Sequence, residues 1–401
     1  SGSPTSVPSI SPTGVKQSTE LWAWGASEGL GVEQPEEFLL PVDIEELVFD
    51  ASAGSDYTLV ILSNRSAFVA GNISLNAYEG HFGVARGDLK NGVNTLIPIT
   101  NVAIIDGDVS DILPAPQFRS VIAGVESSDG SGRIHSVFID MEGNAYASGN
   151  NDVGQLCLGD EVSRDLPTRI KLPGNETAKS AAVGGGFTLI LSDSGRVFGC
   201  GSNAFGQLGL GDVLSTNLPD DGNGLSEAEF ISAGYDFSLV LTRGLTENDL
   251  LYVMGSNDFG QLCFSTGGNP QLTPIRNAGL DGISSIAAGF QSSYISTVDG
   301  NAYACGLNDV GQLGDGSLND SDGTNVTIAE NIIAVFSGPS SKSAFFHEGD
   351  GKIYGTGLNS RGQLGVGDSN STDVPVEVEF SEGETFGNRG LSTSTSHTLA
   401  W

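Results

Sequence analysis

One phrase recurs along the chain and limits the folds that it can adopt. The phrase is Gly-x-Asn-x-x-Gly-Gln-Leu, and its first glycine returns at intervals of 51 to 54 residues. Weaker copies near the start of the chain bring the number of units to seven. A regular repeat of about 50 residues predicts a modular fold in which each unit packs on its neighbours. The first glycines of the phrase, weaker copies included, are Gly25, Gly71, Gly149, Gly201, Gly255, Gly306 and Gly357.

Each unit has two halves with the alternation of β-strands. A second recurring stretch stands before most of the phrases, as in AGSDYTLVIL from Ala53 and VGGGFTLILS from Val183. In both halves apolar and polar residues alternate over about five positions, the period of a half-buried strand. The 57 glycines among 401 residues fit a chain with many turns. We therefore predict an all-β fold, a seven-bladed β-propeller of four-stranded antiparallel blades.

The two ends of the chain complement each other. Residues 391–401 form a first half without a second, whereas residues 21–31 form a second half without a first. We expect both segments to share one blade, because this closes the ring and removes exposed strand edges. Residues 20–401 are thus predicted to be a single propeller domain, and the Ser/Thr/Pro-rich residues 1–19 a flexible leader.

These motifs resemble the regulator of chromosome condensation repeat family, whose fold is a seven-bladed propeller. The complete Gly-Gln-Leu-Gly motif occurs three times, for example at 206–209. The resemblance implies that the first half, upstream of the phrase, often carries a His, as at His135 and His397 here. Aromatic residues at this position, such as Tyr57, keep the packing role and argue against a catalytic His. We expect the repeated Asn and Gln side chains to bond the backbone of their own turns.

The four cysteines occupy equivalent places in different units. Cys157 and Cys263 stand directly after Gly-Gln-Leu, where other units have a glycine. Cys200 and Cys305 directly precede the first glycine of the next phrase. Because the separations are nearly equal, we predict the disulfides Cys157–Cys200 and Cys263–Cys305. A metal site is the weaker alternative, since no Cys-x-x-Cys motif or His/Cys group is present.

Charge and sequons bear on where the protein works. The chain has 17 Lys+Arg against 49 Asp+Glu and a formal net charge of −32, which excludes a nucleic-acid binder that uses a basic surface. No apolar run is long enough for direct membrane insertion. With the disulfides and leader, six possible N-glycosylation sites favour an extracellular or cell-surface protein of the secretory pathway. The sequons are at Asn64, Asn72, Asn175, Asn319, Asn325 and Asn370.

The long spacing between Gly71 and Gly149 predicts an insertion at about 84–133. Long loops on rigid scaffolds commonly carry binding residues. We expect Phe118 and Arg119 to anchor a partner there, since aromatic residues and Arg dominate interface energetics. The alternative is an extended loop that covers a blade edge.

The same insertion contains a weak calcium candidate. Asp106, Asp108 and Asp111 place carboxylates at near-alternate positions, as loops for hard cations do. The glycine and glutamate of a complete EF-hand loop are absent, so a solvated acidic loop is the alternative. No other cofactor is expected.

Three functions are compatible with the sequence. The first is a non-enzymatic, secreted or cell-surface interaction module that presents propeller loops to a protein or glycan partner. The second, implied by the family resemblance alone, is a guanine-nucleotide exchange factor for a small GTPase. The third is a polysaccharide-active propeller enzyme, which requires carboxylates or His to meet in one pocket. Known catalytic motifs are absent from the sequence, so we predict that the protein is not an enzyme.

Overall fold

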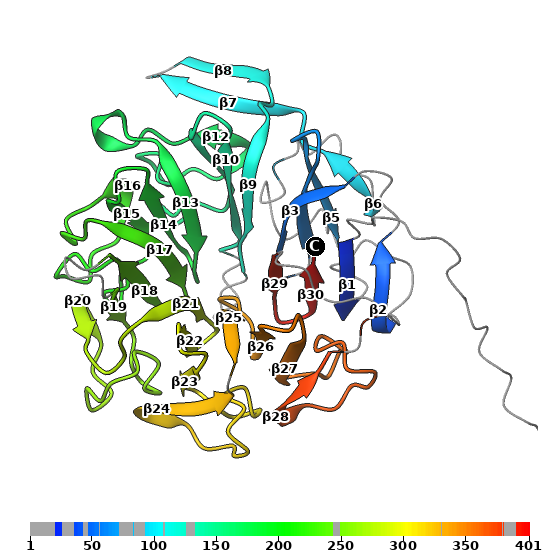
Figure 1. Cartoon of the computed structure of the whole chain (residues 1–401). Helices are drawn as coiled ribbons and strands as arrows, with labels where there is room; N and C mark the ends of the chain where they lie inside the picture. The colour runs from blue at the N-terminus through cyan, green and yellow to red at the C-terminus, as the bar shows by residue number, and fades with distance from the viewer. Residues whose placement is uncertain are drawn as a thin grey trace, which may run out of the picture.

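The structure is a computed structural model. It describes residues 21–25, 36–42, 47–55, 57–71, 83, 93–106, 109–125, 133–243, 249–329, 331–378, 380 and 390–401. These residues form seven β-sheets, six of them four-stranded and antiparallel, arranged as the blades of a propeller (Figure 1). Among them, no helix is long and apolar enough to cross a bilayer.

Each blade runs outward from the strand nearest the axis of the ring. In this order the strands of blades 1 to 4 are β3(Val48–Ala53), β4(Tyr57–Leu62), β5(Ala67–Gly71) and β6(Val93–Pro98); β9(Phe118–Ala123), β10(His135–Asp140), β11(Ala145–Gly149) and β12(Arg164–Arg169); β13(Ala178–Val183), β14(Phe187–Ser192), β15(Val197–Gly201) and β16(Thr216–Asp220); β17(Ala228–Ala233), β18(Phe237–Thr242), β19(Leu250–Gly255) and β20(Gln271–Asn277). Those of blades 5 to 7 are β21(Ile283–Ala288), β22(Ser292–Thr297), β23(Ala302–Gly306) and β24(Ser321–Ala329); β25(Ile332–Phe336), β26(Ser343–Glu348), β27(Ile353–Gly357) and β28(Thr372–Glu377); β29(Leu391–Thr393), β30(His397–Ala400), β1(Leu21–Gly25) and β2(Glu36–Val42).

The ring is closed by the two ends of the chain, as predicted. β1 pairs antiparallel with β30, with Trp22 opposite Ala400 and Gly25 opposite His397. The innermost strands of consecutive blades contact one another all the way around the ring, including β29 with β3. The fully buried Trp24 of β1 packs edge-to-face on Phe345 of blade 6, with ring centroids 6.2 Å apart. Closure therefore buries apolar side chains as well as pairing backbone groups.

Blade 2 departs from the predicted four-stranded form. It is a six-stranded sheet, because the hairpin of β7(Asn101–Asp106) and β8(Val109–Pro114) adds to its outer side. β7 runs parallel to β12 and meets it at Ala103 and Thr168. The hairpin is the real insertion within 84–133, since β6 and β9 in that range are ordinary strands of blades 1 and 2.

The recurring Asn and Gln stabilise their own turns, as expected. All five Asn residues of the complete phrases are buried, and each accepts a hydrogen bond through Oδ1 from the backbone N–H of the Leu five residues later, at 2.8 to 2.9 Å. The Gln Oε1 atoms accept from the backbone N–H two residues earlier. These side chains satisfy buried backbone groups and have no remaining surface for a ligand. The Asn residues are Asn151, Asn203, Asn257, Asn308 and Asn359.

The same turns also lock neighbouring blades together. A Ser or Thr on the second strand of one blade donates a hydrogen bond to the Gln carbonyl oxygen of the preceding blade, at 2.6 to 2.9 Å. Donor and acceptor are fully buried, so losing either partner leaves an unpaired polar group. The pairs are Thr188 with Gln155, Ser238 with Gln207, Ser293 with Gln261 and Thr398 with Gln363.

Both predicted disulfides are present, and each joins two blades. Cys157–Cys200 links blades 2 and 3, and Cys263–Cys305 links blades 4 and 5, with Cα–Cα distances of 5.5 and 5.4 Å. Cys157 and Cys263 both have a φ of +58°, in the region that the glycines of other units occupy. Because a side chain is disfavoured in this conformation, the cross-link keeps a Cys where the turn prefers glycine.

Two kinds of buried titratable group lie between blades. Asp50 of blade 1 accepts a hydrogen bond from the N–H of Val121 in blade 2 at 3.0 Å, and burial raises the pKa of this carboxyl from 3.8 to about 6. His135 and His397 contact the hydroxyls of Thr188 and Thr58 in the next blade. Burial lowers the pKa of His135 from 6.5 to about 4 and that of His397 to about 3, so both imidazoles are neutral at physiological pH.

Removing one inter-blade disulfide should destabilise the ring. We expect the Cys157→Gly/Cys200→Ala variant to lose roughly 2–4 kcal/mol, because the cross-link restricts the unfolded chain. The matched Cys157→Ala/Cys200→Ala variant should lose about 1 kcal/mol more, since alanine keeps a side chain in the left-handed region. Denaturant titration of both variants measures this. Equal losses would show that the backbone of residue 157 is not strained.

The raised pKa of Asp50 predicts a specific pH dependence. The folded-state pKa of about 6 exceeds the ordinary 3.8, so an ionised Asp50 costs stability above pH 6, and this cost is relieved as the pH falls toward 4. We expect Asp50→Asn to stabilise the protein by about 1–3 kcal/mol at pH 8, with a smaller gain at pH 5. Denaturant midpoints at both pH values test this, with the exposed Asp165→Asn as control. A less stable variant at pH 8 would contradict it.

Candidate functional site

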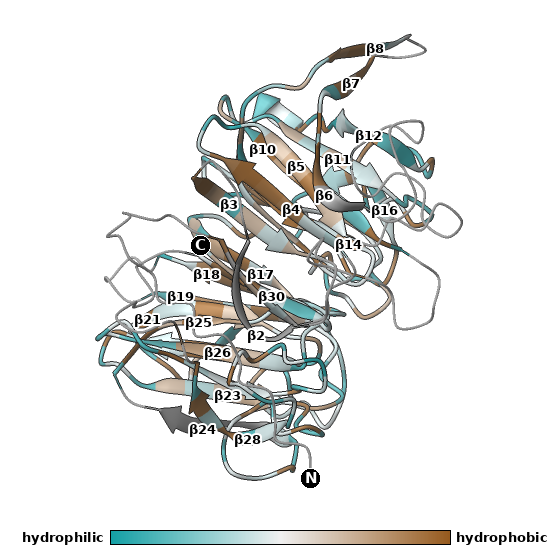
Figure 2. Cartoon of the chain, turned by 90° about the vertical axis from the view of Figure 1, so that its right-hand side faces the viewer, coloured by the Kyte–Doolittle hydropathy of each residue, from teal (hydrophilic) through white to brown (hydrophobic). Residues whose placement is uncertain are grey.

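The hairpin of β7 and β8 is the candidate site for a partner. Its strands pair from Asn101 opposite Pro114 to Asp106 opposite Val109. In Figures 1 and 2 the hairpin projects beyond the ring. It is fixed at its base, where Val102 and Ala103 are buried. A rigid blade therefore carries a strand pair into solvent.

The outer strand of this hairpin exposes apolar side chains. Ile112 is 64% exposed and its neighbour Leu113 is 43% exposed. Adjacent residues of a strand point to opposite faces, so β8 exposes an apolar side chain on each face of the hairpin. Asp111 is exposed beside them. Of these residues, sequence reasoning identifies only Asp111, as a calcium candidate, although Asp-Gly at 106–107 between two apolar segments is a hairpin signal.

Phe118 is not the exposed anchor that the sequence suggested. It is fully buried in the core shared by blades 1 and 2, where its ring lies 5.6 Å from that of Phe138 and 6.2 Å from that of Tyr146. The prediction is wrong because residue 118 begins β9, the innermost strand of blade 2, and is not part of a surface loop.

Arg119 has an interaction within the ring. It is a half-buried residue at an irregularity in the pairing of β9 with β10. Its guanidinium donates hydrogen bonds to the carbonyl oxygens of Ala178 and Lys179 on β13 of blade 3. These bonds tie two inner strands together. A contact between Arg119 and a partner stays a prediction.

The calcium candidate is only partly visible. Asp111 lies on β8 and Asp106 ends β7, but Asp108 and the side chain of Asp106 are outside the described part of the chain. Within that part, no group of three His, Cys, Asp or Glu side chains is placed to hold a metal ion. Calcium binding by Asp106, Asp108 and Asp111 therefore stays a prediction.

Most of the possible glycosylation sites face solvent. The described side chains of Asn64, Asn175, Asn319 and Asn370 are exposed. Asn325 lies on β24, where its side chain is not described, and Asn72 is outside the described residues. The four exposed amides are sterically open to a glycan, and their modification stays a prediction.

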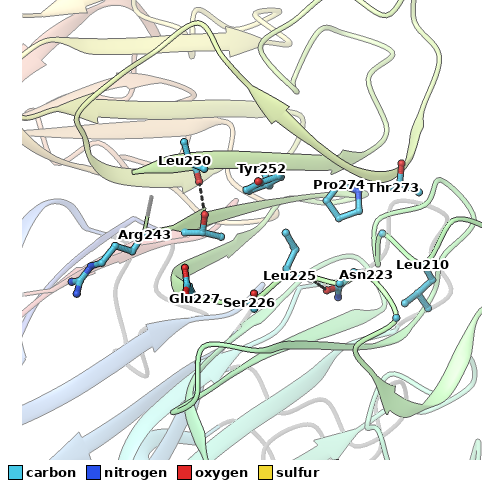
Figure 3. Close-up of a pocket in the computed structure, with 14 residues that line it drawn as sticks. Leu210, Asn223, Leu225, Ser226, Glu227, Arg243, Leu250, Tyr252, Thr273 and Pro274 are labelled. Carbon is cyan, nitrogen blue, oxygen red and sulfur yellow. Dashed lines mark hydrogen bonds between the residues drawn. The ribbon is translucent and has the colours of Figure 1, made fainter. Parts of the chain in front are cut away.

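A cavity of about 430 Å³ opens between blades 3 and 4 (Figure 3). The loop at 222–227 and the side chains of Tyr252 and Arg243 line it. Glu227 is the single acidic residue among the described residues that line it. Arg243 forms an ion pair with Glu229.

A second cavity, of about 390 Å³, lies beside the hairpin and is lined by Ile104, Arg169 and Lys171, with Glu176 as its single acidic residue. The polysaccharide-enzyme alternative requires carboxylates or His to meet in one pocket, and among the described residues neither cavity lining contains two carboxylates or a His.

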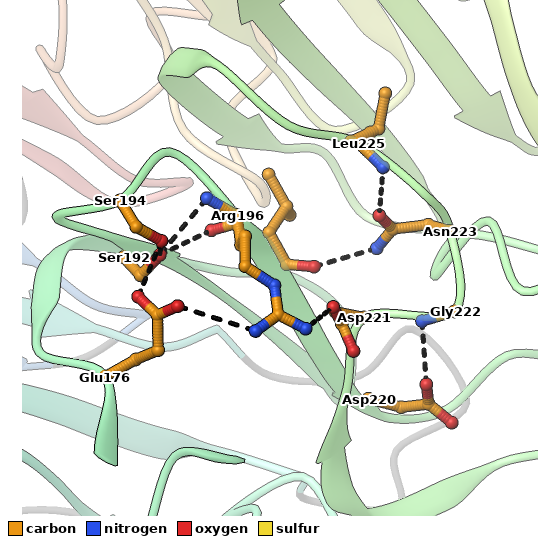
Figure 4. A network of polar contacts seen from close by, with 10 residues as sticks. Glu176, Ser192, Ser194, Arg196, Asp220, Asp221, Gly222, Asn223 and Leu225 are labelled. Atoms are coloured by element: carbon orange, nitrogen blue, oxygen red, sulfur yellow. Dashed lines mark hydrogen bonds and ion pairs between the residues drawn. The ribbon is translucent and has the colours of Figure 1, made fainter. Parts of the chain in front are cut away.

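A network of charged side chains connects three segments of the chain near these cavities (Figure 4). Arg196 bridges Glu176 and Asp221, and Ser194 donates a hydrogen bond to Glu176 at 2.6 Å. The hydroxyl of Ser194, followed by that of Ser192 and by Arg196, lowers the pKa of the Glu176 carboxyl. Arg196, Glu176 and Ser194 are each paired within this network, which indicates a structural role in blade 3.

Comparisons with known proteins agree with this architecture. The family model for the regulator of chromosome condensation (RCC1) repeat matches residues 142–191, 194–241 and 350–401, and a second model of that repeat matches 178–207 and 283–312. The chain is 29% identical to the ultraviolet-B receptor UVR8 of Arabidopsis thaliana over 73% of this chain and 67% of the receptor. It is 28% identical to the human E3 ubiquitin-protein ligase HERC2 over 68% of this chain, which spans only 6% of the ligase.

Solved structures show the same fold. Human WBSCR16 superposes with a TM-score of 0.74, 18% identity, and coverage of 95% of this chain and 99% of that one. Prp20p from Saccharomyces cerevisiae, described with its binding to Gsp1p and histones, gives a TM-score of 0.75 at 18% identity over 95% of this chain and 90% of its own. Together with the repeats, closure and seven blades, these findings show that the chain contains RCC1 repeats and has the seven-bladed fold of the RCC1 propellers.

Proposed function

We propose that this protein is a non-enzymatic interaction scaffold of the secretory pathway that binds a protein partner through the β7–β8 hairpin. The observation that carries the proposal is an apolar strand pair projecting from a closed ring, with Ile112 and Leu113 exposed. A rigid scaffold holds such a strand pair in one geometry, which lowers the entropic cost of binding.

The extracellular part of the proposal is supported by the cysteines and sequons. All four cysteines are in disulfides, which persist in oxidising compartments and are rare in the cytosol. Four sequon asparagines are exposed. The exchange-factor alternative is not adopted for two reasons. The likeness to Prp20p at 18% identity concerns the fold alone, and the nucleus and cytosol are reducing compartments in which disulfides are rare.

Intact-mass analysis of the protein from its native source tests the compartment. We expect the mass to rise by about 4 Da on reduction, one hydrogen for each of the four cysteines. Enzymatic removal of N-glycans should lower the mass, and peptide mapping should place glycans at Asn64, Asn175, Asn319 or Asn370. Free thiols together with unmodified sequons would overturn the extracellular assignment.

Substitution of the exposed apolar residues tests the binding surface. Partners are first isolated by cross-linking to the intact protein, and their affinity for variants is then measured by surface plasmon resonance. We expect Ile112→Ser/Leu113→Ser to weaken binding about tenfold or more, because apolar anchors carry most interface energy. The control is Val298→Ser, which changes a residue that is 79% exposed in blade 5. Unchanged binding by the double variant, or an equal loss in the control, would contradict the proposal.

A further inference from the structure

The outermost strand of blade 2 is an open sheet edge. In the six-stranded sheet β8 pairs with β7 alone, and no described strand lies on its other side. Its residues 110–114 are all exposed. The edges of sheets carry unpaired N–H and C=O groups that another extended chain can bond.

The register identifies which backbone groups are free to bond. The N–H of Ala115 donates to the carbonyl oxygen of Thr100 at 2.8 Å, so residues 100 and 115 are a hydrogen-bonded pair. Such pairs alternate along antiparallel strands, which assigns Asp111 and Leu113 to bonds with β7. The N–H and C=O groups of Ser110 and Ile112 consequently point away from the sheet.

This edge has little of the protection that natural edges carry. Lysines, bulges and prolines at outward-facing positions ordinarily block strand addition. In β8 Pro114 occupies the last of the outward-facing positions, which leaves the N–H groups of Ser110 and Ile112 open, and no irregularity interrupts the pairing of β8 with β7. An open edge of this kind with exposed Ile112 and Leu113 is an aggregation hazard unless a partner occupies it.

Charge indicates what kind of segment fits the edge. Residues 101–114 contain Asp106, Asp108 and Asp111 and no Lys or Arg, on a chain of net charge −32. A second copy of β8 would bring like charges together, and edge pairing of one six-residue strand buries less area than a stable dimer needs. A basic segment is attracted to the same edge. The cations Arg169 and Lys171 line the cavity next to β7, on the inner side of the hairpin.

We propose that β8 binds an extended, Lys- or Arg-containing segment of a protein partner, which adds to blade 2 as a seventh strand. This inference rests on the proposed function and specifies its mode. The main chain supplies affinity through Ser110 and Ile112, while alternate side chains contact Ile112 or Leu113 on the two faces. Asp111 favours basic residues over acidic ones.

Fluorescence anisotropy with two labelled peptides tests the proposal on the full chain. One heptapeptide alternates lysine with valine, and its counterpart alternates glutamate with valine. We expect only the lysine peptide to bind, and we expect Asp111→Asn to weaken its binding about threefold. Equal binding of both peptides, or binding of neither, would overturn the proposal.

A pair of variants at one position separates backbone pairing from side-chain contact. Ile112→Pro removes the outward N–H without breaking a bond to β7, and proline is tolerated on edge strands. Ile112→Ser retains the N–H. We expect the proline variant to lose about tenfold or more of the affinity for the lysine peptide, and the serine variant clearly less. Equal losses would reject strand addition. Circular dichroism must show that both variants keep the native β-sheet signal.

Amide exchange gives a readout that does not depend on substitution. In protein labelled with ¹⁵N-isoleucine, the lysine peptide should slow exchange at the Ile112 amide. Ile104, opposite Asp111 in a hydrogen-bonded pair, should be protected with or without peptide. An unchanged Ile112 amide in the saturated complex would reject the proposal. If the native partner is lost in Ile112→Ser/Leu113→Ser but retained in Ile112→Pro, strand addition fails while the proposed function stands. Concentration-dependent dimers abolished by Ile112→Pro would instead identify the occupant as a second copy.

Discussion

The hydrogen bond from a buried hydroxyl to a Gln carbonyl oxygen is the interaction on which the ring depends. It occurs at four blade junctions, for example from Thr188 to Gln155 and from Thr398 to Gln363. A single blade has no hydrophobic core of its own, since each apolar cluster is built from two adjacent blades. These hydroxyl-to-carbonyl hydrogen bonds fix how neighbouring blades align, and the apolar clusters supply most of the free energy of folding. Pairing of β1 with β30 then makes every blade an internal one.

Covalent and electrostatic details act on the same junctions. Two of the junctions have a disulfide close to this hydrogen bond, and the sulfur of Cys200 lies 3.5 Å from the Gln155 carbonyl oxygen. At the junction of blades 1 and 2, Asp50 takes part through its carboxyl group, whose pKa is raised to about 6 by desolvation. Different junctions thus carry a buried hydroxyl, a disulfide or an acid, and the stability of each junction responds to a different condition.

Sequence reasoning succeeded where the repeat itself carries the information. The glycine spacing predicts the blades, the unmatched halves at 21–31 and 391–401 predict closure, and the matched spacing of the cysteines predicts both disulfides. It failed for Phe118 because spacing locates extra residues without saying which of them form the insertion. The parallel pairing of β7 with β12 and the cavity beside Arg243 depend on contacts between distant segments, for which a single repeat gives no signal.

Amide hydrogen exchange in a chain that ends at Gly390 tests most directly whether the ring is one cooperative unit. This chain lacks β29 and β30, which complete blade 7. If the ring is one cooperative unit, exchange becomes faster throughout, including in β14 and β18 of blades 3 and 4, which β29 and β30 do not touch. If exchange rises in blades 1, 6 and 7 while β14 and β18 remain as protected as in the full chain, the blades are stable without closure and the central claim is wrong.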